Sequence, residues 1–191
     1  MIRREPILFK PIYKQVVWGG DRIGAYKNDP TTPAQTGESW ELSAVEGNVS
    51  EVKGGPYNHQ TLNTLTSIFG PELLGTRVYE TYNGHFPLLI KFIDARDDLS
   101  VQVHPDDTLA MSRHHSPGKT EMWYIIDSEP GAKIYSGLCE QLTPDQYVER
   151  VEKGTFQQAI CSHTPGPGDT FFIPAGRVHA IGAGNLLLEI Q

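Results

Sequence analysis

Short segments rich in Val, Ile, Phe and Tyr, separated by glycine and proline, are the feature that most limits how this chain can fold. The sequence contains 19 Gly and 14 Pro, which interrupt it at short intervals. Many brief strands at such spacing are typical of an antiparallel sandwich or barrel rather than of alternating strands and helices. We therefore predict a mainly all-β fold, with strands at 87–93, 99–104, 122–126, 133–136, 170–173 and 185–190.

Two segments show a helical pattern instead. Residues 61–74 carry apolar side chains at a spacing close to one helical turn, and residues 144–152 follow Thr143, a suitable helix cap. We expect short helical insertions there, one near 61–75, within a single domain of residues 1–191. No run approaches about 18 apolar residues, and the N-terminus lacks the apolar centre of a signal peptide. We therefore expect no membrane span and a cytoplasmic location.

The charge balance and the number of cysteines argue against a nucleic-acid-binding protein and against a disulfide-rich fold. The net charge of −7 argues against nucleic acid as a main partner, since phosphate backbones require a clustered basic surface. A small anionic substrate needs only one or two well-placed cations and stays compatible with this charge. Cys139 and Cys161 are too few for a disulfide scaffold, so we expect reduced thiols. No oligomeric state follows from the sequence.

Four residues form a candidate metal site. Gln102 and His104 lie two apart in an expected strand, so they point to one face, and burying both without partners would be costly. Glu121 opens the next strand, and His179 follows a Pro-Ala-Gly turn. Two imidazoles, a carboxylate and an amide oxygen suit Zn²⁺, with Mn²⁺, Fe²⁺ and Co²⁺ as alternatives. A lone histidine is more often a core or surface residue, so the joint spacing carries this prediction of one zinc ion per chain.

That spacing resembles a known superfamily. The pattern Gly-x5-Pro-x-Gly-x2-His from Gly168 to His179 resembles the second cupin signature. Gln102-x-His104 followed by Glu121 resembles the first signature, with Gln in place of its usual first His. Within the cupins, the chain is similar to the compact bacterial form of the type I mannose-6-phosphate isomerases. This similarity covers nearly the whole chain and rests on 9–13, 17–20, 37–43, 99–107, 118–124 and 172–181.

The resemblance implies a cupin-type antiparallel β-barrel, or jelly roll, and a zinc-dependent aldose–ketose isomerase that interconverts mannose 6-phosphate and fructose 6-phosphate. Such chemistry requires a Lewis acid, a proton carrier and a cation for the phosphate. Lys119 shares a face with Glu121, which makes it the strongest candidate for a catalytic cation. Its alternative is a solvated loop lysine.

Further site residues are expected inside apolar strands. Lys91 and Glu189 each interrupt an apolar segment, and we interpret them as catalytic residues that contact a substrate phosphate or hydroxyl or relay a proton. A structural carboxylate that holds an inward Lys91 is the alternative. Trp18 and Glu41 are expected to line the substrate pocket, although core packing explains Trp18 equally well.

Family members continue beyond the position of Gln191 with a segment that contains an arginine implicated in catalysis, and then with a second barrel. We therefore expect this chain to be the N-terminal part, without that C-terminal barrel. Two other functions stay open. A cupin metal oxygenase would use Fe²⁺ and O₂ in the same pocket, although Lys119 and Lys91 count against it. A non-catalytic sugar-binding barrel is the other alternative.

Overall fold

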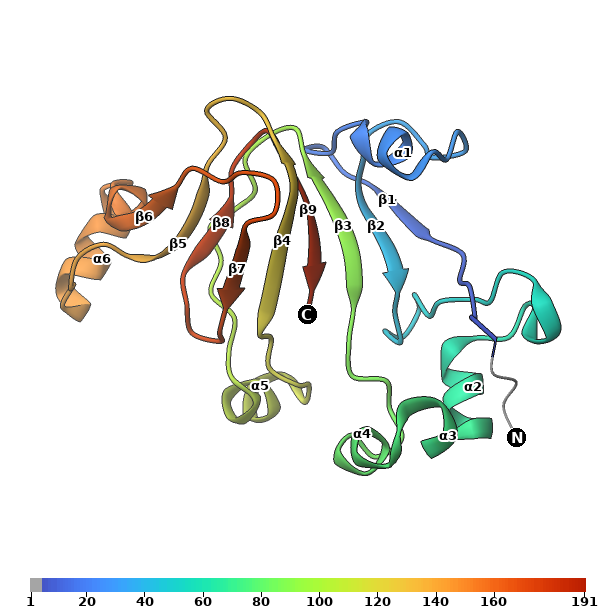
Figure 1. Cartoon of the computed structure of the whole chain (residues 1–191). Coiled ribbons are helices and arrows are strands. Elements are labelled where there is room, and N and C mark those ends of the chain that lie inside the picture. Colours follow the sequence, from blue (N-terminus) through green and yellow to red (C-terminus); the bar gives the residue numbers. More distant parts are fainter. Residues whose placement is uncertain (1–4) are drawn as a thin grey trace.

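The computed structural model describes residues 5–191 and consists of two antiparallel sheets (Figure 1). The strands are β1 (Ile12–Gln15), β2 (Thr36–Leu42), β3 (Ile90–Ala95), β4 (Glu121–Ser128), β5 (Ile134–Leu138), β6 (Ile160–His163), β7 (Thr170–Ile173), β8 (His179–Ile181) and β9 (Asn185–Ile190). The larger sheet has six strands in the order β1-β2-β3-β9-β4-β7, and the smaller has the order β6-β5-β8. Strand β9 thus lies between β3 and β4, in the middle of the larger sheet.

Helices lie at the edges and ends of these sheets (Figure 1). They are α1 (Arg22–Lys27), α2 (Leu62–Phe69), α3 (Pro71–Leu74), α4 (Thr76–Thr81), α5 (Asp107–His114) and α6 (Pro144–Glu152), with short 3-10 turns η1 (Gly55–Tyr57) and η2 (Phe156–Ala159). The helix predicted at 61–74 is confirmed as α2 and α3, which Gly70 separates, and the helix predicted after Thr143 is confirmed as α6. No helix in residues 5–191 is long and apolar enough to cross a membrane.

Five of the six predicted strands are confirmed, as β3, β4, β5, β7 and β9, with shifts of up to three residues at their starts. The strand predicted at 99–104 is wrong. This segment makes one isolated bridge, Gln102 opposite His179, and its side chains Val101 and Val103 are exposed. Pro105 ends the pairing, because proline has no N–H to donate.

The core lies between the two sheets. Ile93, Trp123 and Leu187 project from the larger sheet and pack against Ile134 and Ile181 of the smaller one. This layering gives a mainly antiparallel β fold, as expected. Within the described part of the chain, however, the hydrogen-bonded ladders form two separate sheets and do not join into one closed barrel.

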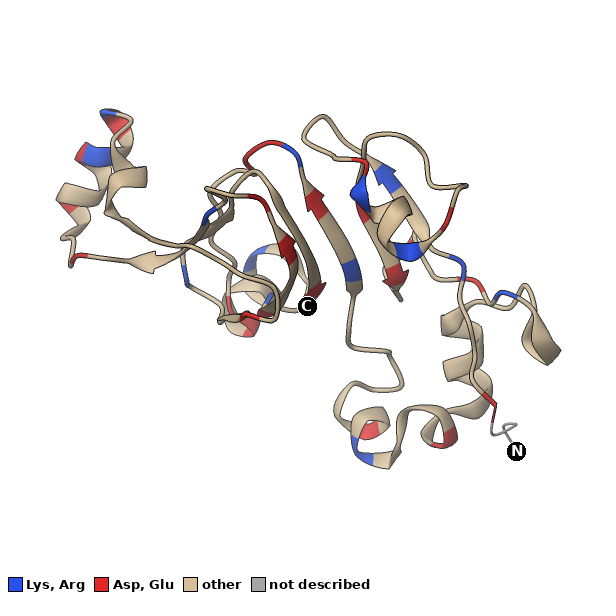
Figure 2. Ribbon diagram, turned by 45° about the horizontal axis from the view of Figure 1, so that its top comes forward, with Lys and Arg blue, Asp and Glu red and all other residues tan. Residues whose placement is uncertain are grey.

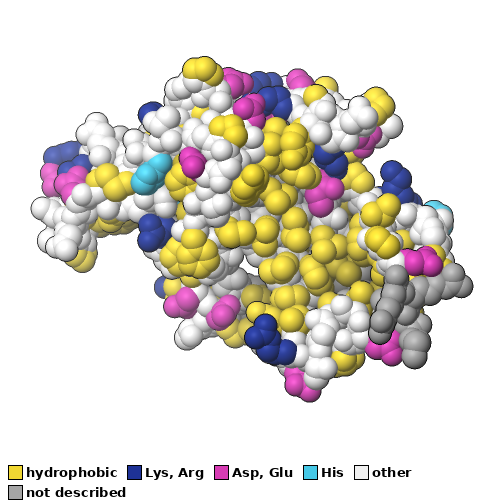
Figure 3. All heavy atoms as spheres, viewed as in Figure 1, with side chains coloured by type: hydrophobic (Ala, Val, Ile, Leu, Met, Phe, Trp, Pro, Cys, Tyr) yellow, Lys and Arg dark blue, Asp and Glu magenta, His cyan; other side chains and the backbone are white. Residues whose placement is uncertain are grey.

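The opposite face of the larger sheet is also apolar. Phe92, Leu188 and Tyr124 lie opposite one another on β3, β9 and β4, and Met122 lies opposite Phe172 in the next row. Figure 3 shows apolar side chains gathered over the central strands on this side of the molecule. We call this the outer face, and the face toward the smaller sheet the inner face. Charged residues interrupt the strands as well as occupying helices and loops (Figure 2).

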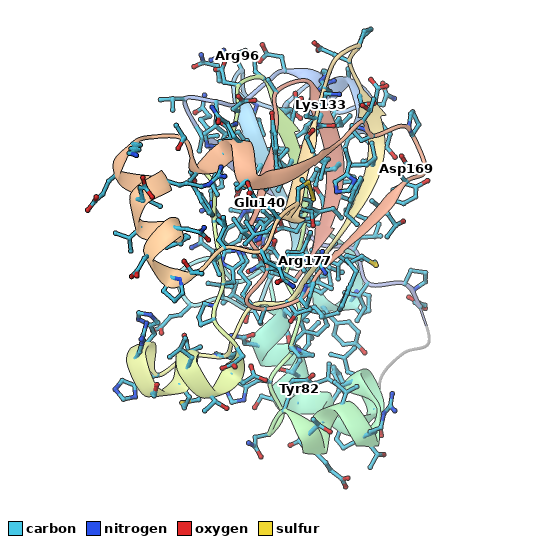
Figure 4. The ribbon with its side chains drawn as sticks, turned by 90° about the vertical axis from the view of Figure 1, so that its left-hand side faces the viewer. Tyr82, Arg96, Lys133, Glu140, Asp169 and Arg177 are labelled. Carbon is cyan, nitrogen blue, oxygen red and sulfur yellow. A yellow bond between two sulfur atoms is a disulfide. The ribbon has the colours of Figure 1, made fainter. Side chains whose placement is uncertain are left out.

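The two cysteines correct a prediction. Cys139 and Cys161 form a disulfide in the structure, with their Cα atoms 4.9 Å apart. The expectation of reduced thiols is wrong here because β5 pairs with β6 in antiparallel fashion, which brings together residues 22 positions apart in the chain. The segment between them contains α6 and η2 and projects to one side of the sheets (Figure 4).

Candidate active site

Backbone pairing brings the predicted metal ligands together from three segments. Gln102 and His179 exchange two backbone hydrogen bonds, of 2.8 and 2.9 Å. The turn before His179 is tied to the same segment, because the Gly176 N–H donates to the His104 carbonyl at 2.8 Å. Glu121, the first residue of β4, pairs with the end of β7 just before this turn. The site therefore depends on the turn that joins β7 to β8.

Three side chains converge closely, and we call them the His–Glu–His cluster: His104, Glu121 and His179. Their ligand atoms all lie within 4.8 Å of one another. Nε2 of His104 is 3.4 Å from Oε1 of Glu121, and Nε2 of His179 is 3.5 Å from Oε2. Nδ1 of His179 lies 2.8 Å from the Arg177 carbonyl. A proton on Nδ1 would be donated there, which leaves the Nε2 lone pair facing Glu121.

The cluster has the properties of a metal site. Nε2 of His104 and Oε2 of Glu121 are buried and have no hydrogen-bond partner in the structure. Burial, and then the positive charge of Lys119, lowers the pKa of His104 from 6.5 to about 4, so its imidazole is neutral at physiological pH. Neutral imidazoles and a carboxylate are the forms that bind a divalent ion, and an ion would satisfy both orphaned atoms.

Gln102 lies beside this cluster. Residues directly opposite in an antiparallel pair project to the same side, so Gln102 faces the same way as His179. Its side-chain nitrogen donates to Oγ of Ser100 at 3.1 Å. Gln102 also lines the cavity next to the cluster, which makes it available as a fourth ligand.

Lys119 reaches Glu121 as the sequence predicts, with Nζ 2.6 Å from Oε1. The preceding residue explains how the loop comes so close. A Cβ on Gly118 would lie 2.5 Å from the backbone carbon of Asp106, so a side chain there would push the loop away. The Gly118 N–H also donates to Oδ1 of Asp107 at 2.8 Å. The start of α5 therefore holds Lys119 over the cluster.

A cavity of about 150 Å³ opens beside the cluster. Most of its polar lining residues are ionisable, and the polar lining consists of Glu38, Lys91, Ser100, Gln102, Lys119, Glu121, His179 and Glu189. All three predicted catalytic residues therefore meet at one cavity with the predicted metal ligands Gln102, Glu121 and His179.

Lys91 lies between two carboxylates on the inner face. Its Nζ is 3.0 Å from Oε1 of Glu189 and 3.3 Å from Oε1 of Glu38. Burial alone would lower the pKa of Lys91, but the charges of Glu189 and Glu38 outweigh it and raise the pKa above 10.5. Lys91 is therefore a cation held by carboxylates, as one of the two interpretations of the sequence expects.

The structure does not bring Trp18 and Glu41 to this cavity. Trp18 packs against the hydrophobic core, as the alternative interpretation expects. Glu41 projects to the other side of β2 from Glu38, where Nζ of Lys27 lies 2.5 Å from Oε1 of Glu41. Strand alternation therefore turns Glu41 away from this cavity.

Glu38 and Trp123 line the cavity but do not appear among the residues predicted from the sequence. A signal for Glu38 existed, because residues 38 and 41 of one strand cannot share a face, and only one of them could accompany Lys91. No such signal existed for Trp123, since an aromatic residue in an apolar strand is ordinarily a core residue.

The fold and the site together define a mainly antiparallel β protein with a candidate His–Glu–His metal centre in a charged cavity. Residues 7–122 match the family described as phosphomannose isomerase type I, catalytic domain. The chain belongs to this family.

Several relatives are similar along nearly the whole chain. Mannose-6-phosphate isomerase ManA of Bacillus subtilis is 40% identical over 98% of this chain, which spans 58% of that protein. Mannose-6-phosphate isomerase of Streptococcus mutans is 35% identical over 98% of this chain, which spans 57% of that protein. The crystal structure of the mannose 6-phosphate isomerase from Bacillus subtilis matches with a TM-score of 0.89 and 33% identity, covering 98% of this chain and 58% of that one.

Proposed function

We propose that this protein is an aldose–ketose isomerase that interconverts mannose 6-phosphate and fructose 6-phosphate. The observation that carries the proposal is the His–Glu–His cluster with Lys119 at 2.6 Å from Glu121, inside a cavity that also contains Lys91 and Glu189. The relatives at 35–40% identity are named for this activity. Because the chain spans 58% of the first relative, the activity is proposed for the protein as a whole.

We further propose Zn²⁺ as the bound ion, one per chain, with His104, Glu121, His179 and Gln102 as ligands. The mixed nitrogen and oxygen donors support zinc. A distant solved mannose 6-phosphate isomerase, 14% identical with a TM-score of 0.74, is described as bound with zinc and yttrium. When bound, such an ion would supply a Lewis acid that polarises the substrate carbonyl.

The chain's own residues would handle the charges of the reaction. Isomerisation moves a proton between C1 and C2, and negative charge grows on the carbonyl oxygen as the C–H proton leaves. Nζ of Lys119 is placed to stabilise an oxygen bound next to Glu121. Oε1 of Glu189 lies 3.0 Å from Nζ of Lys91, and Glu189 lines the same cavity, which supports a role in proton relay or ring opening.

The charge around Lys91 favours one of its two expected contacts. Lys91, Glu38 and Glu189 together carry a net charge of −1, so a phosphate dianion would be repelled there. A sugar hydroxyl can both donate to a carboxylate and accept from the ammonium group. We therefore propose that Lys91 and its partners bind substrate hydroxyls, and that the phosphate binds elsewhere.

A jelly-roll fold and a cytoplasmic location are consistent with the proposed function. We propose that the two sheets are the layers of a cupin-type jelly roll, since the metal ligands lie on the segment and strands that face each other across the cavity. The cytoplasmic location expected from the sequence stays a prediction.

A coupled assay tests the function. Fructose 6-phosphate formed from mannose 6-phosphate is converted to glucose 6-phosphate and detected through NADPH formation, with and without chelator. We expect turnover that chelator abolishes and Zn²⁺ restores. Lys119→Ala should lower kcat by about 100-fold, whereas Lys53→Ala, an exposed lysine, should leave it unchanged.

Two outcomes would replace this proposal. Binding of mannose 6-phosphate by calorimetry without any turnover would favour a sugar-binding protein. Oxygen consumption with Fe²⁺ and an organic substrate, without isomerisation, would favour an oxygenase.

A further inference from the structure

An unbroken row of side chains crosses four strands on the inner face. Trp40 of β2 lies opposite Lys91 of β3, Lys91 lies opposite Glu189 of β9, and Glu189 lies opposite Trp123 of β4. Glu38, next to Trp40 on the same face, joins the row through Lys91 at 3.3 Å. The side chains therefore contact one another in the order Trp40, Glu38, Lys91, Glu189, Trp123.

Each carboxylate in the row is held at both oxygens. Nε1 of Trp123 donates to Oε2 of Glu189 at 2.9 Å, while Oε1 of Glu189 lies 3.0 Å from Lys91. Nε1 of Trp40 donates to Oε2 of Glu38 at 2.6 Å, while Oε1 of Glu38 faces Lys91. Rotation of a carboxylate held in this way about its terminal bond would break its hydrogen bond from an indole or its ion pair with Lys91.

The two ends of the row differ in their access to water. Trp123 is 1% exposed and the Glu189 side chain is 4% exposed. The Glu38 side chain is 18% exposed, and Trp40 is only partly buried. Water can therefore replace the indole at Glu38, whereas removal of the Trp123 N–H leaves Oε2 of Glu189 without a donor.

Trp123 also touches the metal cluster. Its ring meets the His179 ring edge to face, with 5.5 Å between the centroids. One rigid side chain thus contacts both a predicted metal ligand and the carboxylate of Glu189. The position of Glu189 relative to the cluster depends on this residue.

We propose that Trp123 is a positioning residue. Its indole N–H holds the Glu189 carboxylate in the orientation that keeps Oε1 on Lys91, and its ring sets the place of that carboxylate relative to His179. Trp123 itself does no chemistry and acts through Glu189. The kinetic consequence rests on the proposed isomerase function, but the hydrogen bond can be tested without turnover.

The kinetic test compares two matched variants in the zinc-loaded protein. Trp123→Phe removes the N–H and keeps an aromatic ring, and we expect kcat to fall about tenfold with KM within about twofold. Trp40→Phe is the control and should lower kcat by less than about threefold. In a Glu189→Gln background, Trp123→Phe should cause less than about a twofold further loss, because the partner through which it acts is already changed.

The outcomes are decisive in both directions. Full additivity of Trp123→Phe and Glu189→Gln, or equal effects of the two tryptophan variants, would overturn the proposal. Metal content of Trp123→Phe should match the wild type, and a loss of metal would overturn the proposal, because the substitution would then act through the metal cluster rather than through Glu189.

A second measurement needs no turnover. In ¹H–¹⁵N spectra the three tryptophans give indole N–H signals, and Trp18→Phe and Trp40→Phe assign that of Trp123 by elimination even if Trp123→Phe does not fold. We expect Glu189→Gln to shift the Trp123 signal and leave that of Trp40 in place. We also expect the indole N–H proton of Trp123 to exchange with water more slowly than that of Trp40.

An unmoved Trp123 signal would overturn the proposal whatever the enzyme does. A shifted signal in a protein that does not turn over mannose 6-phosphate would support the positioning contact and refute the proposed function, so the two failures are distinct.

Discussion

The two faces of the six-stranded sheet carry opposite chemistry. On β9, Glu189 points to the inner face and is buried against Lys91, while Leu188 points to the outer face. On β4, Glu121 is buried at the cluster, whereas Tyr124 is 45% exposed. Ordinarily a half-buried sheet shows charges to water and apolar side chains to the core. Around the cavity this sheet does the reverse.

The inversion supports the chemical roles proposed for the buried charged residues. A buried ion pair stabilises a protein weakly, and apolar residues of similar volume in its place are often neutral or stabilising. Lys91, Glu38 and Glu189 are therefore not explained by stability. The orphaned atoms of His104 and Glu121 are a further cost of the same kind. The buried charged groups of the inner face therefore lower the stability of the protein while they form the charged cavity.

Removal of a cluster histidine should have the largest effect on this contrast. His104→Ala should lose its metal, because the substitution removes one of the imidazole ligands. Elemental analysis should fall from about one ion per chain to near zero. The control His114→Ala, an exposed residue of α5, should keep its metal. Retention of metal by His104→Ala would remove the inner face from the metal-binding hypothesis.

Lys91→Met should come next. The substitution leaves the buried Glu189 and the partly buried Glu38 without their cation, which is expected to lower the free energy of unfolding by about 3 kcal/mol. Urea unfolding measures the loss, and Lys53→Met, an exposed lysine, serves as the control. An unchanged midpoint of urea unfolding would show that water solvates these carboxylates once Lys91 is replaced.

The low pKa of His104 predicts a pH effect of smaller size. In the unfolded chain this histidine takes up a proton near its usual pKa of 6.5, but in the folded protein only near about 4. The unfolded state therefore binds more protons as the pH falls through 6.5, and stability is lost. Between about pH 7.5 and about pH 5 the metal-free protein should lose about 2 kcal/mol through this residue.

The His104→Gln variant isolates that contribution. Its free energy of unfolding should fall less steeply over the same pH interval, and parallel curves would contradict the burial of a neutral imidazole. Chelator must be present throughout, because bound metal would suppress the protonation.

Neighbouring residues on β7 give the smallest expected effect and a matched comparison of the two faces. Phe172 is 64% exposed on the outer face, whereas Ile173 is 1% exposed on the inner face. Phe172→Ala should change stability by about 0.5 kcal/mol, and Ile173→Ala by about 3 kcal/mol. Equal losses in chemical unfolding would show that another part of the protein covers the outer face.

Much of the site was predictable from the sequence because it depends on local spacing. The turn before His179 is set by Pro174 and Gly176, and Lys119 lies two residues before Glu121. The sequence therefore placed His179 and Lys119 correctly beside Glu121. Segment 99–104 was assigned to a strand, however, since a pattern of alternation cannot reveal whether a partner strand runs alongside. Glu41 was expected at the cavity and Glu38 was not, for the same reason: which side of β2 faces the cavity depends on β3.

The sequence by itself therefore determined the β-rich class, two of the helical segments and the candidate metal ligands, because turn residues, caps and short motifs act over a few positions. Only the tertiary structure decided the rest. Cross-strand register assembled Trp40, Lys91, Glu189 and Trp123 from segments up to 149 residues apart, and the pairing of β5 with β6 joined Cys139 to Cys161. Register is set by the packing of whole strands, which no local pattern contains.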